Sequence, residues 1–268
     1  MRAAEAAGVQ RFVFVSLVGL SDALVARAPF AAAKRQTEQL LAASAMRSVI
    51  VRPAAFQEVW LAADTGIDPK KHRAVIFGQG RSPVNYIAVD DVAEARVRLA
   101  LADDPPAAVE LGGPESLTRR EVVDAFERAY GVRFRRIAVP RPVMALGARA
   151  MRRLIPRMAS VMGMALSMDV DGCPIDPGPV RALGIEPRTM TAAIAAMPGA
   201  RTSSAQVRPR ESQLGGVVRL GVGPAWDHVM AIDTGDLAPD ASGPAACRWG
   251  AGVRLRGARM TPPRPVAE

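Results

Sequence analysis

The sequence predicts an α/β fold: part of a doubly wound parallel sheet, followed by a small helical region and a low-order tail. Two short apolar runs, "RFVFVS" (11–16) and "SVIVRP" (48–53), are typical of buried strands. One amphipathic helix joins them, which predicts a βαβ unit with a right-handed crossover. Residues 11–16 show no alternation of polar and apolar side chains, so we expect both faces of this strand to be covered.

The composition is that of a globular protein with few aromatic side chains. Of the 268 residues, 49% are hydrophobic and 4% aromatic, so alanine, valine and methionine must fill most of the core. The net charge of +9 favours anionic partners such as a nucleotide, a nucleic acid or an acidic membrane. Most of this charge is dispersed arginine, which is typical of a solvated surface, and nucleic-acid binding is therefore not expected.

Cysteine and histidine usage excludes several classes of site. Cys173 and Cys247 lie far apart, which argues against a disulfide framework and favours a reducing cytoplasm. His72 and His228 lack neighbours at ligand spacing, so no metal site is expected. No apolar run is long enough to span a bilayer, and the N-terminus lacks the apolar core of a secretory signal.

The first half of the chain reads as alternating helices and strands. A helix end closes at Gly8, strand 11–16 follows, and a loop leads to a helix with Pro29 in its first turn. After strand 48–53, residues 62–82 read as a loop and 84–89 as a strand or extended segment. A helix at 90–101, with Asp90 or Asp91 as N-cap, precedes a strand at 107–113.

The second half is predicted to be helical up to about residue 200. Thr118 and Glu121 have capping-box spacing at the start of a helix that Gly131 ends. Residues 142–166 read as one or two helices rich in methionine and arginine, broken near Pro156. After residue 200 no period is sustained, and we expect a poorly ordered tail.

A glycine-rich phosphate-binding turn is not found between a strand and a helix. "RLGVGPAW" (219–226) has the first spacing of G-x-G-x-x-G, but Trp226 occupies the place of the third glycine. "FGQG" (77–80) and "LGGP" (111–114) are predicted to be turns.

Five segments in order resemble the NmrA-like branch of the atypical short-chain dehydrogenase/reductases, a family of NAD(P)-binding Rossmann proteins. They are "AAGVQRFVFVS", "AKRQTEQLLAAS", "VIVRPAAFQEVWL", "FGQGRSPVNYIAVDDVAEA" and "LGGPESLTRREVVDAFERAYG". The resemblance continues more weakly to about residue 197. It implies that residues 1–115 are the C-terminal half of an NAD(P)-binding Rossmann-like domain, 116–200 a small helical substrate region and 201–268 a low-order tail. The family's first strands and phosphate-binding loop have no counterpart, so we expect an N-terminally truncated form.

The resemblance implies a set of cofactor-binding residues. Lys34 matches the lysine of the Y-x-x-x-K helix, which holds the nicotinamide ribose, and Ser16 ends the strand near the nicotinamide. The loop after the next strand would lie against the carboxamide, and it contributes Pro53, Ala54, Ala55 and Phe56. Phe30, in the place of the tyrosine, and Glu58 would lie on the substrate side, as would Phe56.

Purely structural roles are also open for the same residues. Lys34 is four residues before Glu38, which is the spacing of a surface ion pair on a helix. Ser16 could bond backbone groups, and Glu58 could be a helix-start carboxylate. Of the phenols, Tyr130 reads as packing, and nothing supports an acid role for Tyr86. The arginines of 133–157 read as a solvated amphipathic face, with docking on anionic lipid or a partner as the alternative.

The resemblance implies an NAD(P)-binding, oxidoreductase-like protein, and the sequence does not assign either NAD or NADP as the preferred dinucleotide. The resemblance implies hydride transfer from the nicotinamide to a small carbonyl or quinone. No catalytic residue is assigned, because Phe30 has no proton to give; a hydroquinone can take its proton from solvent. The alternatives are a dinucleotide-sensing regulator with a protein partner, or an inactive fragment without the phosphate-binding loop.

Overall fold

The computed structural model of the chain describes residues 2–200, which lie within a single compact unit. The predictions for 201–268 concern the tail, the "RLGVGPAW" segment, Cys247 and His228, and they lie outside the described residues. The predicted division at residue 115 stays a prediction.

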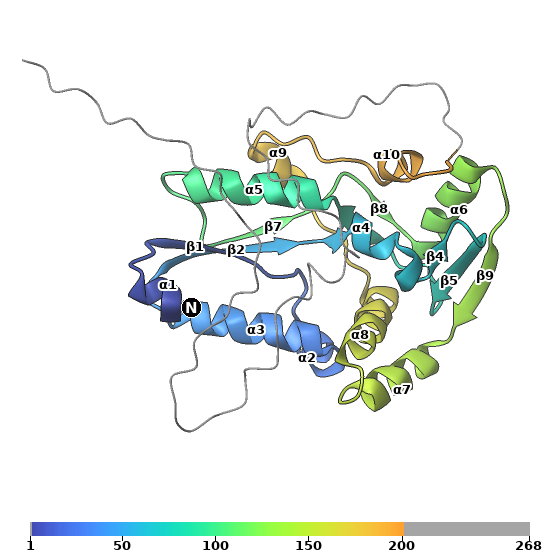
Figure 1. Ribbon diagram of the computed structural model, residues 1–268, viewed down its shortest axis with the longest axis horizontal. Helices are drawn as coiled ribbons and strands as arrows, with labels where there is room; N and C mark the ends of the chain where they lie inside the picture. The colour runs from blue at the N-terminus through green and yellow to red at the C-terminus, as the bar shows by residue number, and fades with distance from the viewer. Residues whose placement is uncertain (1, 201–268) are drawn as a thin grey trace, which may run out of the picture. The chain divides into compact units, whose positions relative to one another are not determined.

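A three-stranded parallel sheet forms the first layer of the fold. It consists of β1 (Arg11–Val15), β2 (Arg47–Pro53) and β7 (Ala108–Leu111), in that spatial order. Figure 1 shows α3 (Pro29–Ala42) on one face of this sheet and α5 (Val89–Leu101) on the other. The β1–α3–β2 unit and the doubly covered parallel sheet confirm the predicted α/β class.

Strand β1 is less buried than expected. All five of its residues are half-buried, whereas Val49 and Val51 of β2 are almost fully buried. The reason is its position: β1 lies at the edge of the sheet, with β2 as its sole neighbour among residues 2–200. The prediction of two covered faces therefore holds only in part, since an edge strand exposes one long side to solvent.

Short helices flank the first strand. α1 (Arg2–Ala6) precedes Gly8, whose φ of +69° fits the predicted helix end. Residues expected to be a loop before Pro29 contain α2 (Asp22–Arg27). Ser21 begins α2 by accepting a hydrogen bond from the backbone N–H of Leu24 at 3.2 Å.

Two further three-stranded sheets contain elements that the sequence did not predict. The first combines β3 (Ala55–Phe56), β6 (Val84–Ile87) and β8 (Ser116–Leu117); the second combines β4 (Ile67–Asp68), β5 (Arg73–Phe77) and β9 (Arg135–Val139). The predicted loop at 62–82 therefore holds a 3-10 turn, η1 (Ala63–Thr65), and two strands. Strand β5 is fixed by parallel pairing with β9, a distant contact that local patterns do not reveal.

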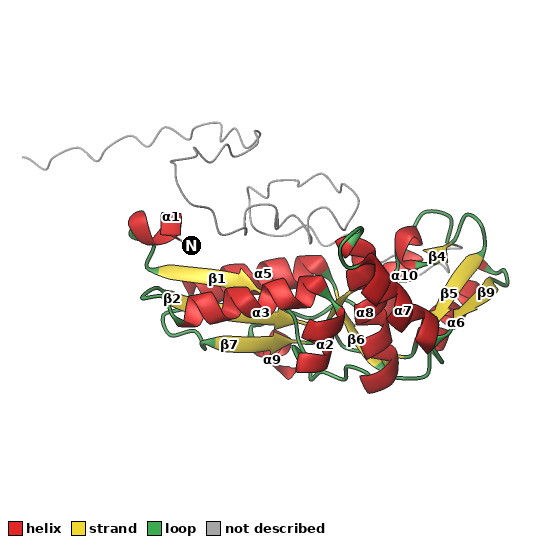
Figure 2. Ribbon diagram, turned by 90° about the horizontal axis from the view of Figure 1, so that it is seen from below, coloured by secondary structure: helices red, strands yellow, loops and turns green. Residues whose placement is uncertain are grey.

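Helices complete the second part of the described chain. They are α4 (Gln57–Trp60), α6 (Arg119–Tyr130), α7 (Arg141–Met151), α8 (Pro156–Asp171), α9 (Gly178–Ala182) and α10 (Met190–Ala195). The helix break near Pro156 is confirmed, since Pro156 is the first residue of α8. Figure 2 shows α7 and α8 packed side by side. None of the described helices combines the length and hydrophobicity that a bilayer crossing requires.

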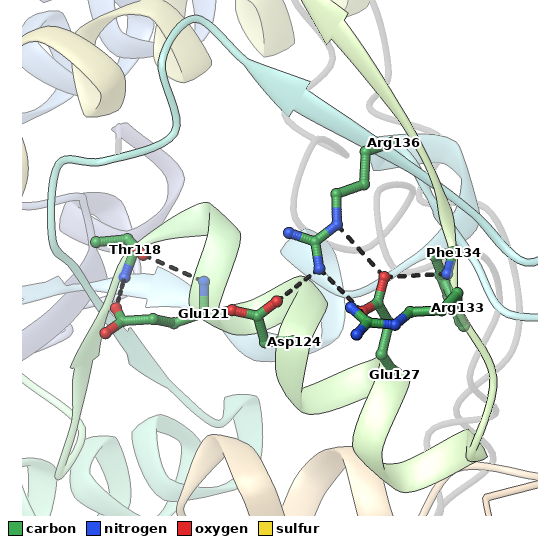
Figure 3. A network of polar contacts seen from close by, with 7 residues as sticks. All are labelled: Thr118, Glu121, Asp124, Glu127, Arg133, Phe134 and Arg136. Atoms are coloured by element: carbon green, nitrogen blue, oxygen red, sulfur yellow. Dashed lines mark hydrogen bonds and ion pairs between the residues drawn. The ribbon is translucent and has the colours of Figure 1, made fainter.

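The ends of α6 are fixed by polar contacts. Figure 3 shows the predicted capping box, in which Thr118 accepts from the N–H of Glu121 and the Glu121 carboxylate accepts from the N–H of Thr118. Further along, the guanidinium of Arg136 donates to both Asp124 and Glu127, which ties β9 to α6. Gly131, with φ of +66°, ends the helix as predicted.

Two large apolar cores lie under these elements, beside a small cluster of Leu24, Ala28 and Ala31. One fills the space between the first sheet, α5 and α9; the other lies between β5, β6, α6 and α8. Phe56 packs against both, so the loop after β2 joins the two cores. This position holds the carboxyl end of the first sheet against the rest of the described chain.

Candidate functional site

Lys34 lies inside the fold, between α3 and the first sheet. Its side chain is buried, and its Nζ donates to the carbonyl oxygen of Val15 at 2.7 Å. The ammonium lies 4.9 Å from the ring centre of Phe14 and 5.1 Å from that of Phe30. Both distances allow cation–π attraction. Burial lowers the pKa of Lys34 from 10.5 to about 8.

The surface ion pair that the sequence left open for Lys34 is not present. Glu38 instead accepts two hydrogen bonds from Arg52 of β2, at 3.1 and 2.7 Å. Partial burial raises the pKa of Glu38, but the bonds from Arg52 outweigh it and the net pKa is lowered. Within residues 2–200, Lys34 has no carboxylate partner, so a buried cation is left without a counter-charge.

Ser16 follows β1 directly and lies next to the carbonyl that Lys34 bonds. Its backbone N–H donates to Val51 at 2.7 Å, which extends the pairing of β1 with β2 by one residue. The side chain is 3% exposed, and its Oγ makes no hydrogen bond of normal geometry among the described residues, although the hydroxyl contributes to lowering the pKa of Glu38. A buried hydroxyl without a full partner is costly, and such groups mark sites where a ligand or water bonds.

Phe30 is half-buried one turn before Lys34 on α3. Its backbone N–H donates to Ser160 of α8 at 3.1 Å, which fixes the start of α3 against that helix. The ring contributes no donor or acceptor to the neighbourhood of Lys34. The structure thus places an apolar ring over the Lys34 ammonium.

The loop after β2 lies beside Ser16 at the same edge of the sheet. The carbonyl of Pro53 accepts from Val18 at 3.2 Å, and the N–H of Ala54 donates to Leu111 at 2.9 Å. Pro53, Ala54 and Ala55 are buried. The loop is therefore held on both sides by backbone bonds, one to the segment after β1 and one to β7.

Glu58 and Gln57, at the start of α4, have structural partners. The Glu58 carboxylate accepts from the N–H of Val89 at 3.0 Å, at the start of α5, and burial raises its pKa. Glu58 lies in the first turn of α4, as the helix-start alternative expected, but it is half-buried rather than solvated and its bond goes to the start of α5. Gln57 is 1% exposed; its Nε2 donates to Arg188 at 2.8 Å, but its Oε1 has no partner among the described residues.

The predicted N-cap at Asp90 or Asp91 is wrong. Helix α5 begins at Val89, and its N-cap is Ala88, which has no side-chain acceptor. Asp91 instead accepts from the N–H of Arg188 at 2.8 Å, and Asp90 pairs with the Arg188 guanidinium. The sequence pattern predicted the wrong N-cap because the carboxylate at the start of α5 comes from Glu58, which is distant in sequence.

The two phenols lie away from Lys34. Tyr86 of β6 is buried in the second core, where burial raises its pKa. Tyr130 packs against Phe126 and donates to Pro198 at 3.0 Å, which confirms its packing role. Neither contributes a proton donor to the predicted site.

The predicted site residues do not line the main cavities of the described chain. A cavity of about 30 Å³ lies in the second core and is lined partly by Trp60, Tyr86, Arg119 and Asp169. An open pocket of about 490 Å³ lies beside α3 and is lined by Gly19, Leu20, Ser21, Arg35, Glu38, Arg52 and Glu110. Arg52 and Glu38 pair with each other there. Ser16 and Lys34 are not among the residues that line this pocket.

Some of the site residues predicted from the sequence therefore lie together in the structure, whereas others do not, and one polar residue beside them was not predicted. Ser16, Lys34 and Phe30 share one neighbourhood with the carbonyl of Val15, and the 53–56 loop adjoins it. Glu58 bonds away from it toward α5. Gln57 was missed, since a lone glutamine before an apolar helix carries no chemical signature in sequence.

Comparison with known proteins identifies the type of domain. Residues 1–104 match a protein-family model described as NAD(P)H-binding. No curated protein matches the sequence.

The fold is similar to several solved structures. A nucleoside-diphosphate-sugar epimerase from Staphylococcus aureus has a TM-score of 0.59 and 16% identity, over 72% of this chain and 67% of that one. An NADPH-dependent quinone oxidoreductase from Escherichia coli, complexed with NADPH, has a TM-score of 0.57 and 19% identity, over 72% and 68%. Leucoanthocyanidin reductase from Vitis vinifera has a TM-score of 0.55 and 18% identity, over 72% and 70%.

The resemblance seen in the sequence is thus confirmed by two independent comparisons. The family match fixes the cofactor class as NAD or NADP, and the neighbours share the fold. Residues 1–104 match the NAD(P)H-binding family model, and the described chain shares the fold of the epimerase and the reductases named above.

Proposed function

We propose that the chain binds the nicotinamide half of NAD(P)H at the carboxyl end of β1 and β2 and serves the reduction of a small quinone. The observation that carries this proposal is the buried Lys34 ammonium, which lacks a carboxylate and bonds one carbonyl. An ammonium has three N–H groups, so two remain for acceptors such as ribose hydroxyls. The buried Oγ of Ser16, next to that carbonyl and interacting with Glu38, supplies a second polar group.

The remaining residues have positioning roles in this proposal. The backbone of Pro53, Ala54, Ala55 and Phe56 lies against the carboxamide, and Phe30 lines the approach of the substrate; Glu58, which bonds the start of α5, has no part in this proposal. All proposed contacts are with the nicotinamide half of the cofactor. When bound, the reduced nicotinamide supplies the hydride. The protein's own part is to orient the ring and exclude water around Lys34.

A quinone suits these residues better than an aliphatic carbonyl. Reduction of a quinone takes one hydride and one proton to give a hydroquinone, and water at the open edge can supply the proton. An aliphatic carbonyl needs a positioned acid at its oxygen. Phe30 stands where that acid would be, and Tyr86 is buried in the second core. The quinone oxidoreductase among the structural neighbours is consistent with this choice.

A dinucleotide-sensing regulator is the second candidate. The observation that favours it is the apolar ring of Phe30 over Lys34, because a sensor needs the cation to bind but no proton donor. We place either protein in the cytoplasm, in keeping with the free Cys173 and the low cysteine content. We also retain residues 116–200 as the region that shapes the substrate side.

The binding claim is tested by titrating the full chain with NADPH and with NADH. Lys34→Met keeps the length and apolar stem but removes the ammonium, and we expect it to weaken binding about tenfold, as for one charge-assisted hydrogen bond. Lys70→Met is the matched control, because Lys70 is exposed on a turn and lies outside the site. Equal affinity in the two variants would remove Lys34 from the site.

Turnover separates the two candidates. We expect NADPH oxidation on addition of a small quinone to the wild-type chain. Phe30→Tyr, which restores a phenol beside the ammonium, should leave quinone reduction within about twofold and add carbonyl reduction. Binding without turnover in both proteins would favour the sensor.

A further inference from the structure

The connection between α7 and α8 presents an unusual surface. Figure 1 shows α7 on the outer side of α8, at the margin of the fold. We call this surface the α7–α8 tip and define it by its exposed residues: Val143, Leu146, Arg149, Arg152, Arg153, Leu154, Ile155, Arg157 and Met158. It lies on different elements from the Lys34 neighbourhood and is independent of the proposed function.

Large apolar side chains at the tip face solvent. Leu154 is 84% exposed, Leu146 69% and Ile155 52%. On α7 itself, Met144 and Ala148 face the core, whereas Val143 and Leu146 face outward. The outward face of α7 thus also carries large apolar side chains, which is a feature of helices with a second apolar contact.

The charge around these apolar residues is entirely positive in sequence. Between Arg141 and Ser167 there is no aspartate or glutamate. Arg157 pairs with Asp64 at 2.9 Å, and Arg152 donates to the carbonyl of Ala26.

Two of the tip's arginines have no protein partner in the described part of the chain. Arg149 and Arg153 are exposed, and their guanidinium groups bond no carboxylate or carbonyl among residues 2–200. Arg153 directly precedes Leu154 and Ile155. Free guanidinium groups beside exposed leucine and isoleucine make a surface that is both basic and apolar.

We propose that the α7–α8 tip docks on the surface of a bilayer that contains anionic phospholipid. Charge complementarity selects this occupant, because guanidinium groups bond lipid phosphate while Leu154 and Ile155 enter the region between headgroups and acyl chains. A nucleic acid would use the arginines but would gain nothing from burying two aliphatic side chains against phosphate. A second copy would bring the same uncompensated positive charge to the contact.

The test is co-sedimentation of the full chain with vesicles. Vesicles of phosphatidylcholine with about 30 mol% phosphatidylserine should bind the chain, and pure phosphatidylcholine should bind it much more weakly. Raising the salt from about 0.1 M to about 0.5 M should release most of it.

Matched double variants locate the contact. Each arginine near an anionic surface contributes about a fivefold gain in affinity, so Arg149→Gln with Arg153→Gln should weaken binding roughly 20- to 30-fold. Leu154→Ser with Ile155→Ser should weaken it about tenfold or more by removing apolar insertion. Arg96→Gln with Arg128→Gln removes the same charge from exposed sites on α5 and α6 and should change binding by no more than about twofold. Circular dichroism checks that every variant is folded.

Three outcomes would overturn the proposal. The first is equal binding of the wild-type chain to both kinds of vesicle. The second is an arginine variant at the tip that binds phosphatidylserine vesicles as well as the α5–α6 control does. The third is a different occupant: a DNA duplex whose affinity depends on Arg149 and Arg153 but not on Leu154 and Ile155, or a dimer in sedimentation that Leu154→Ser with Ile155→Ser dissociates.

Discussion

Replacing Lys34 by methionine should stabilise the chain near neutral pH, although the side chain makes a good hydrogen bond. Burial lowers the pKa of Lys34 from 10.5 to about 8. At about 1.4 kcal/mol for each tenfold change in the proton equilibrium, this corresponds to about 3 kcal/mol of lost stability at pH 7. Loss of the bond to the Val15 carbonyl costs about 1 kcal/mol in return, so the expected net gain is about 2 kcal/mol.

The stability gained in Lys34→Met depends on pH, because the folded and the unfolded wild-type chains lose the Lys34 proton at different pH values. Between about pH 8 and pH 10.5 the unfolded chain keeps the Lys34 proton while the folded chain has lost it. The unfolded state then binds more protons, and the stability of the wild-type chain rises with pH across this window. The advantage of Lys34→Met over wild type should therefore shrink by about 2 kcal/mol from about pH 7 to about pH 9.5.

Urea denaturation of both proteins at the two pH values measures this change, with Lys70→Met as a control. Lys70 is exposed, so its variant should follow the wild-type stability within about 0.5 kcal/mol at both values. A Lys34→Met chain that is less stable than wild type at pH 7, or whose advantage is independent of pH, would refute the buried, uncompensated ammonium.

Four further substitutions test other parts of the fold by urea denaturation. Arg119→Met should destabilise by about 3 kcal/mol, because the buried guanidinium donates to three backbone carbonyls that would be left without partners; a neutral effect would contradict this. Gly113→Ala should cost about 3 kcal/mol or more, since a Cβ there would lie 1.8 Å from the carbonyl oxygen of Tyr86, whereas Gly8→Ala, with open space around it, should cost about 1 kcal/mol. Thr118→Ala should cost about 1 kcal/mol through loss of the capping box, and an unchanged urea midpoint would show that the cap contributes nothing.

The parts of the fold that were predictable are those with local signals. The apolar strands at 11–16 and 48–53 carry their own pattern, and the capping box at Thr118 with Gly131 at the other end bounds α6 within the sequence itself. Pro156 marks the start of α8 for the same reason, since proline has no N–H to donate in a helix interior. Each of these features is determined by residues within the same helix or strand, or directly next to it in the sequence.

The helices and strands that the sequence did not predict depend on partners that are distant in the sequence. β5 is a strand because it pairs in parallel with β9, almost 60 positions later, and the polar residues around it suggested a loop. The first N–H of α5, that of Val89, donates to the Glu58 carboxylate, 31 positions earlier, so the carboxylate at this helix start is not Asp90 or Asp91. Such contacts become visible only when the chain is folded.

The sequence placed Ser16, Phe30 and Lys34 near one another, as the structure has them, but it did not reveal the charges around Lys34. Lys34 has helical spacing to Glu38, and a surface pair was a sound inference from spacing. In the structure, Glu38 pairs with Arg52 of the neighbouring strand, and Lys34 points inward and donates to the carbonyl of Val15. Which partner a carboxylate takes depends on the distance between α3 and β2, a quantity that the sequence does not contain.

The measurement that tests the central claim most directly is a titration of the full chain with reduced nicotinamide mononucleotide, the half of the cofactor that Lys34 and Ser16 are proposed to hold. The account predicts saturable binding, weakened about tenfold in Lys34→Met and unchanged in Lys70→Met. Absence of saturable binding to the wild-type chain, or equal binding by the Lys34→Met chain, would contradict it.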